Sequence, residues 1–146
     1  MNIIQTVRSN DLHKIKKLIA QNVDINIRDE YGYTALIWAC SYGYTDIAKA
    51  LMDAGADLDS TDTSGRTALI WSSYYGHIEL VQNLIEAGAN TKAKDCDGLT
   101  ALKIAKERNH RDIANLLTKN VTKKPTKNIN EEVCKEYAEI DNKKGE

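Results

Sequence analysis

The chain has 146 residues, of which 42% are hydrophobic and 28% charged, and its formal net charge at pH 7 is −1. This composition predicts one soluble domain with a modest core, and the near-neutral charge argues against a nucleic-acid partner. The three cysteines lack CxxC spacing, which predicts a reducing, cytoplasmic location. The sequence has no cleavage site and no apolar run long enough for a membrane span, so we expect neither a signal peptide nor a membrane partner.

A fixed repeat period organises the chain. The segment Gly32-Tyr-Thr-Ala-Leu-Ile-Trp38 recurs one period later as Gly65-Arg-Thr-Ala-Leu-Ile-Trp71, and more weakly after a second equal period, from Gly98. Residues 29–61 and 62–94 are identical at 13 of 33 positions, which are the turn residues, the small residues and the core leucines. A period of this length predicts a stack of repeats that present the same apolar face to one another.

Residues 1–28 are predicted to be a truncated first repeat that begins inside its first helix. Displaced by one period, Leu18 aligns with Leu51 and Asp24 aligns with Asp57. The charged residues of this segment sum to +3, which is typical of the solvated outer face of a terminal cap.

Residues 29–61 are predicted to be the first complete repeat. Residues 29–32 have the composition of a turn, and Thr34 is a suitable N-cap for a short helix. Gly43 ends that helix, and a second helix follows until Gly55, which we expect in the left-handed conformation. The residues of the second helix that we expect to face inward are Ile47, Ala48, Leu51 and Met52.

The next two units, residues 62–94 and 95–120, repeat this plan, the last one with decay. Asn109 stands where the complete repeats have a helix-breaking glycine, and Asn10 and Asn22 replace the two glycines in the first repeat. Asparagine tolerates left-handed geometry best after glycine, so these replacements support the assigned register.

Residues 121–146 break the period and are rich in charge. We therefore place the repeat domain at residues 1–120 and a polar tail after it. Two interpretations of the tail stay open: a mobile segment, or a short helix at residues 131–140 that docks on the repeats.

The pattern Asp-x-x-Gly-x-Thr-Ala-Leu, then helix, Gly, helix and Gly-Ala-Asp, resembles the ankyrin repeat over about residues 1–120. The resemblance implies an all-α repeat solenoid of helix–turn–helix units, with short β-turn or hairpin connections and a concave face made by the turns and the first helices. The chain departs from the family in two ways that we expect to alter local rigidity but not the fold. The usual proline is replaced by alanine, at Ala35, Ala68 and Ala101. The usual histidine is replaced by Ile37, Ile70 and Lys103.

The sequence predicts no enzyme: it has no catalytic residues, no cofactor site and no metal site. His77 and His110 occupy equivalent repeat positions, so we expect them to be structural. The segment from Asp95 to Gly98 resembles the start of a calcium loop but lacks the later ligands. Cys40 is expected to be an inert core thiol, and Cys96 an exposed thiol at a turn tip.

The resemblance implies that partner contacts come from the turn tips and the ends of the first helices. Six of the seven tyrosines fall between residues 31 and 75, and tyrosine is favoured in recognition surfaces. The alternative is that these rings fill space at the repeat joints of a chain without phenylalanine. Trp38 and Trp71 are expected to be mostly buried between repeats, with an exposed ring edge left open. The predicted partner-binding residues are Glu30, Tyr31, Tyr33, Ser41, Tyr42, Ser64, Arg66, Tyr74, Tyr75, Leu99 and Arg108.

The function predicted from these features is a non-enzymatic protein–protein interaction module, a monomeric adaptor or inhibitor. Residues 29–61 carry a net charge of −5, so the aromatic centre suits a partner protein with a basic contact segment. The alternative is a microbial or viral effector that acts on a host protein. The Asn-, Lys- and Ile-rich composition is compatible with this because an AT-rich genome favours those residues.

Overall fold

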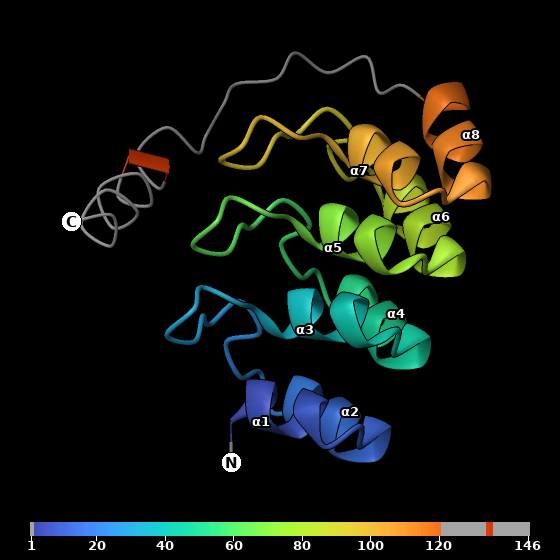
Figure 1. The fold of residues 1–146 in the computed structure, drawn as a ribbon. Helices are drawn as coiled ribbons and strands as arrows, with labels where there is room; N and C mark the ends of the chain where they lie inside the picture. The colour runs from blue at the N-terminus through green and yellow to red at the C-terminus, as the bar shows by residue number, and fades with distance from the viewer. Residues whose placement is uncertain (1, 121–133, 136–146) are drawn as a thin grey trace.

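The computed structural model describes residues 2–120 and 134–135; residues 2–120 contain eight helices and no strand, and residues 134–135 are helical. Figure 1 shows the helices arranged in pairs that stack in chain order, with the turns between the pairs projecting on the side of the first helices. The prediction of an all-α solenoid of helix–turn–helix units is confirmed. The helices are α1 (Ile3–Arg8), α2 (Leu12–Ala20), α3 (Ala35–Tyr42), α4 (Thr45–Asp53), α5 (Ala68–Tyr75), α6 (Ile78–Ala87), α7 (Ala101–Glu107) and α8 (Arg111–Lys119).

The helices form two layers. The first helices of successive pairs pack on one another from α1 through α3 and α5 to α7, and the second helices do the same from α2 to α8. Leu36 and Leu69 lie in the first layer and Leu51 and Leu84 in the second, all of them fully buried. Each buried leucine contributes about 2 kcal/mol through removal of apolar surface from water.

The isoleucines that replace the family's histidine take part in this core. Ile37 and Ile70 are each 1% exposed and belong to the hydrophobic core. Lys103 stands at the same position in the last repeat and is exposed. The departure from the family pattern therefore adds apolar contact wherever another repeat follows.

Local hydrogen bonds begin each of the last three repeats as the sequence predicts. The hydroxyl oxygens of Thr34, Thr67 and Thr100 accept from the backbone N–H three residues later, at 3.2, 3.2 and 3.3 Å. In the turn before each threonine, one carboxylate oxygen of Asp29, Asp62 or Asp95 accepts from two or more backbone N–H groups at 2.9 to 3.0 Å.

Backbone hydrogen bonds also join successive turns. The N–H of Thr63 donates to the carbonyl oxygen of Tyr31 at 3.1 Å, and the N–H of Cys96 donates to that of Ser64 at 3.0 Å. The turns are therefore held in register with one another, so residues at equivalent turn positions form a column.

The predicted left-handed positions are confirmed. Gly55 and Gly88 have φ angles of 87° and 99°, and Asn10, Asn22 and Asn109 have φ angles between 55° and 62°. The replacement of glycine by asparagine thus follows the backbone geometry, because both residues tolerate positive φ.

Gly88 offers a direct test of the helix end. No heavy atom lies within 4 Å of a Cβ built there, so a side chain costs only backbone strain. We expect Gly88→Val to lower the free energy of unfolding in urea by roughly 1–3 kcal/mol, because a β-branched residue is strained at positive φ. Gly88→Asn is the matched control and should lose less, since Asn22 adopts this geometry at the equivalent position. An unchanged free energy for the valine variant would contradict the assignment.

The expectation that Cys96 is an exposed thiol is wrong. Cys96, in the turn of the last repeat, is bonded to Cys134 in a disulfide, with a Cα–Cα distance of 5.1 Å. The two residues lie 38 positions apart, and Cys134 follows the end of the periodic pattern, so spacing alone did not reveal the pair. Cys96 is therefore not an exposed thiol, and the cysteine count no longer argues for a reducing compartment.

The predicted helix at residues 131–140 lies outside the described residues except for Cys134 and Lys135, which are both helical. The boundary of the repeat domain at residue 120 stays a prediction. We expect a chain that ends near Val121 to keep its helical circular-dichroism signal and most of its melting temperature, because the described core lies before that point. The full chain in reductant is the control, since both samples then lack the disulfide. Loss of signal and melting transition together would mean that the tail belongs to the core.

Candidate partner-binding site

Two partly buried hydrogen bonds orient the tryptophans of the central repeats. Trp38 Nε1 donates to Asp29 Oδ2 at 2.8 Å, and Trp71 Nε1 donates to Asp62 Oδ2 at 2.7 Å. Each aspartate thus uses one oxygen to hold its turn and the other to hold an indole ring. Both tryptophans are half-buried, which matches the expectation of buried rings with an exposed edge.

Tyrosines extend this arrangement to the surface. Tyr42 stacks on Trp38 with ring centroids 5.4 Å apart, and Tyr75 stacks on Trp71 at 5.9 Å. Tyr33, from the turn, contacts both indoles, at 4.8 Å from Trp38 and 6.0 Å from Trp71. The two central repeats therefore present the same tryptophan–tyrosine stack, and Tyr33 connects the two copies.

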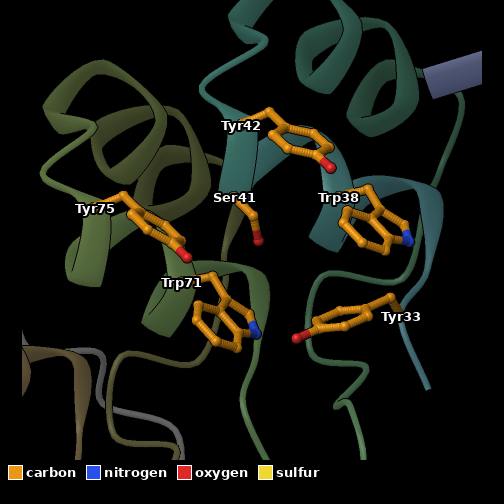
Figure 2. A pocket seen from close by; sticks show the side chains of 6 residues that line it. All are labelled: Tyr33, Trp38, Ser41, Tyr42, Trp71 and Tyr75. Atoms are coloured by element: carbon orange, nitrogen blue, oxygen red, sulfur yellow. The ribbon is translucent and has the colours of Figure 1, made fainter. Parts of the chain in front are cut away.

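These rings enclose a pocket of about 330 Å³ between the second and third repeats. Figure 2 shows Trp38 and Tyr42 facing Trp71 and Tyr75 across a hollow, with Tyr33 at one end. The side chains that line it, which we call the aromatic pocket, are Tyr33, Trp38, Ser41, Tyr42, Trp71 and Tyr75.

Burial raises the pKa of Tyr33 to about 12, and the nearby Asp62 carboxylate acts in the same direction. The sign follows because both burial and a neighbouring negative charge disfavour the phenolate. The hydroxyl of Tyr33 is therefore neutral at physiological pH and keeps its proton to donate.

Arginines of the chain lie on the rings beside the aromatic pocket. The guanidinium carbon of Arg8 lies 5.2 Å from the Trp38 ring centroid. That of Arg66 lies 4.8 Å from the Trp71 centroid, and Arg66 Nε is 3.3 Å from Asp95 Oδ2. Arg108 lies 3.9 Å from the Tyr74 centroid. This face therefore already engages cations through its aromatic rings.

The structure places the predicted site residues in three groups. Tyr33, Ser41, Tyr42 and Tyr75 are brought together in the aromatic pocket. A neighbouring cluster consists of Arg66, Tyr74 and Arg108. Tyr31 lies next to the aromatic pocket, with its ring centroid 6.5 Å from that of Tyr33. The residues that do not join either set are Glu30, Ser64 and Leu99.

Each of these three residues has a different environment. Glu30 is exposed at its turn. Ser64 donates its hydroxyl to Asp62 Oδ1 at 2.8 Å, so it supports the turn. Leu99 packs against the hydrophobic core.

The predicted site residues did not include the two tryptophans that form the walls of the pocket, nor the aspartates that orient them. A signal was present in the sequence. The pair Asp29 and Trp38 recurs one repeat period later, with the same separation, as Asp62 and Trp71. This recurring acid–indole pair keeps a polar contact at the same place in both central repeats.

The two repeated histidines have structural contacts, as expected. His77 Nε2 lies 3.2 Å from the carbonyl oxygen of Ser41, and His110 Nε2 lies 3.1 Å from that of Tyr74. Each ring thus ties the start of a second helix to the end of the first helix in the preceding repeat. Cys40 is fully buried, and burial raises the pKa of its thiol to about 12, so the thiolate is not formed at neutral pH.

Within residues 2–120 and 134–135, no group of three or more His, Cys, Asp or Glu side chains is arranged to hold a metal ion. No helix in this part of the chain has the length and apolar character to cross a bilayer.

The sequence matches the family profile described as ankyrin repeats (3 copies), at residues 3–95 and 54–131. The chain belongs to the ankyrin repeat family. Its repeats therefore constitute a protein–protein interaction module, a kind of module that is not itself catalytic.

Individual relatives match over shorter stretches. The acyl-CoA-binding domain-containing protein 6 homolog of Dictyostelium discoideum is 49% identical over 51 residues, which is 34% of this chain and 18% of that protein. Protein phosphatase 1 regulatory subunit 27 of Homo sapiens is 46% identical over 52 residues, or 36% of this chain and 34% of that protein. Human acyl-CoA-binding domain-containing protein 6 is 38% identical over 52 residues, or 35% of this chain and 18% of that protein. The matched region thus spans about a third or less of these relatives.

Proposed function

We propose that this protein is a non-enzymatic adaptor or inhibitor that binds a partner protein through the concave aromatic face of its central repeats. The observation that carries the proposal is the exposure of aromatic rings on a rigid base. Tyr31, Tyr42 and Tyr75 are 58%, 46% and 49% exposed, and the last two stack on tryptophans held by partly buried hydrogen bonds.

Such a surface suits binding for an energetic reason. A tyrosine that is already held against an indole loses little side-chain entropy when a partner covers it. Gathered apolar surface of this kind is uncommon on a monomer unless it serves recognition. Three of the four exposed large hydrophobic residues in the described part of the chain belong to this face.

The carboxylates beside the two indoles favour a basic segment in the partner, although Arg8, Arg66 and Arg108 of the chain also lie on rings of this face. Two carboxylates, Asp29 and Asp62, lie directly against the indole N–H groups. Asp46 and Asp53 also belong to the acidic second repeat, but they lie in α4, in the other helix layer. The attraction therefore comes from the aspartates of the turns and from the ring faces, more than from the total charge of the repeat.

The name of one relative describes it as a regulatory subunit of protein phosphatase 1. A repeat module that covers a surface of another protein regulates it without chemistry of its own. We propose this mode of action here, with a single copy of the chain as the binding unit.

The test is capture of a partner by the immobilised chain from an extract of the producing cell, followed by mass spectrometry. The captured protein must then bind the purified chain directly, as measured by calorimetry, and must bind the Tyr42→Ala, Tyr75→Ala double variant more weakly. Equal binding by both forms would place the interface on another face. A partner found only in a foreign host would support the effector interpretation. Multi-angle light scattering measures the molar mass in solution and so tests whether the chain is a monomer.

A further inference from the structure

We propose that the aromatic pocket receives the guanidinium group of an arginine side chain of the partner. This inference rests on the proposed function and deepens it, because it names the chemical group that the face recognises. The three joints between successive repeats can be compared directly, because the repeat period places equivalent residues at each of them.

At the two outer joints an arginine of the chain lies on the tryptophan. Arg8 lies over Trp38 at the joint of the first and second repeats, at 5.2 Å. Arg66 lies over Trp71 and Tyr74 at the joint of the third and fourth repeats, at 4.8 and 5.7 Å. In both contacts the group that lies over the indole ring is a guanidinium.

The central joint lacks both of those arginines. Ser41 stands at the helix position that Arg8 fills one repeat earlier, and Tyr33 stands at the turn position that Arg66 fills one repeat later. Ser41 is too small to cover the neighbouring rings, and the hollow of about 330 Å³ lies there. None of the six side chains that line it is charged.

A carboxylate lies beside each of the two indoles that form walls of this hollow. Asp29 Oδ2 and Asp62 Oδ2 accept from the two indole N–H groups, and Asp62 is only 1% exposed, so solvent screens its charge weakly. At the equivalent place in the last repeat, where Ile104 replaces the tryptophan, Asp95 Oδ2 instead pairs with the guanidinium of Arg66. The carboxylate at this repeat position orients an indole in the second and third repeats and binds a guanidinium in the fourth.

The polar atoms in the pocket fit a donor-rich ligand. Figure 2 shows the Ser41 hydroxyl oxygen directed into the space that the other five side chains surround. That hydroxyl donates to the carbonyl oxygen of Ile37 at 2.9 Å, so its lone pairs remain to accept from a ligand. A guanidinium supplies five N–H donors, is planar and weakly hydrated, and stacks on aromatic faces, whereas an ammonium is compact and strongly hydrated. Arginine is therefore preferred to lysine.

The experiment follows the indole N–H resonances of Trp38 and Trp71 in the ¹⁵N-labelled full-length chain. The probes are N-acetyl-arginine amide, the lysine analogue and the citrulline analogue, which has the shape of arginine without its charge. We expect saturable shifts with arginine, at least about fivefold weaker binding with lysine, and no saturable shift with citrulline. Equal responses to arginine and citrulline, or no saturable arginine shift up to about 0.2 M, would overturn the inference.

A variant closes the pocket from within. Ser41→Arg places a guanidinium where Arg8 stands in the first repeat, and we expect it to weaken the arginine response at least about tenfold with an unchanged melting temperature. Glu107→Arg is the matched control, because it puts the same side chain at the equivalent position of the last repeat, away from the pocket. The control should keep the response. If Ser41→Arg does not fold, Ser41→Tyr closes the pocket with the residue that Tyr74 provides at the same position.

The outcomes separate this inference from the proposed function. Partner binding that depends on Tyr42 and Tyr75, in a chain without an arginine response, keeps the proposed function and removes the inference. An arginine response in a chain that captures no partner keeps the guanidinium site and removes the proposed function. Indole shifts that depend on protein concentration without any arginine would identify a second copy as the occupant and also overturn the inference.

Discussion

Replacing Tyr42 and Tyr75 together by alanine is expected to weaken partner binding by about 2 kcal/mol or more, with the melting temperature changed by only a few degrees. Both rings are roughly half exposed, and each stacks on a tryptophan that its own aspartate holds in place. The core beneath them is filled by leucines and isoleucines of both helix layers, so the tyrosines are not needed to fill it. Calorimetric affinity and thermal unfolding, measured on the same preparation, give both quantities.

The alternative that these rings only fill space at the joints expects the opposite result. In that case the melting temperature falls steeply, and binding is lost only because the protein unfolds. Ile78→Ala is a matched control, because Ile78 is 44% exposed, belongs to α6 and does not line the aromatic pocket. It should leave affinity unchanged. A stable double variant with undiminished affinity would show that the partner binds elsewhere.

The second large effect is expected at Gly76, where alanine should lower the free energy of unfolding by about 3 kcal/mol. Gly76 has a φ angle of 76°, which strains any residue with a Cβ. In addition, a Cβ at this position would lie 2.8 Å from Cε1 of His110, whose ring bridges to the carbonyl oxygen of Tyr74. Urea unfolding measures the loss.

Gly88→Ala separates the two contributions to this loss. Gly88 also has a positive φ, but no heavy atom lies within 4 Å of its Cβ position, so about 1 kcal/mol of backbone strain is expected. Equal losses at the two positions would mean that the histidine ring moves aside without cost. The chain itself supports a difference, because asparagine replaces the glycine equivalent to Gly76 in the first repeat, where Tyr44 and not a histidine occupies the corresponding position of the next repeat.

Local features of this protein were predictable from the sequence. Thr34, Thr67 and Thr100 cap helices, and the asparagines that replace glycine adopt positive φ, because both properties depend on a few neighbouring backbone groups. The repeat period then extends these local features to a stack, since equal units present equal apolar faces to their neighbours. The sequence by itself therefore determined the fold class, the repeat family and the face on which the tyrosines gather.

The tertiary structure alone decided how side chains from different repeats meet. The aromatic pocket combines residues of one turn and two first helices, and it is hollow because Ser41 stands where neighbouring repeats have Arg8 and Tyr74. The bond between Cys96 and Cys134 likewise joins a turn to a segment after the period ends. A periodic pattern describes what the repeats share, whereas a binding site depends on how they differ at a joint, and those differences acquire meaning only when the side chains are placed against one another in space.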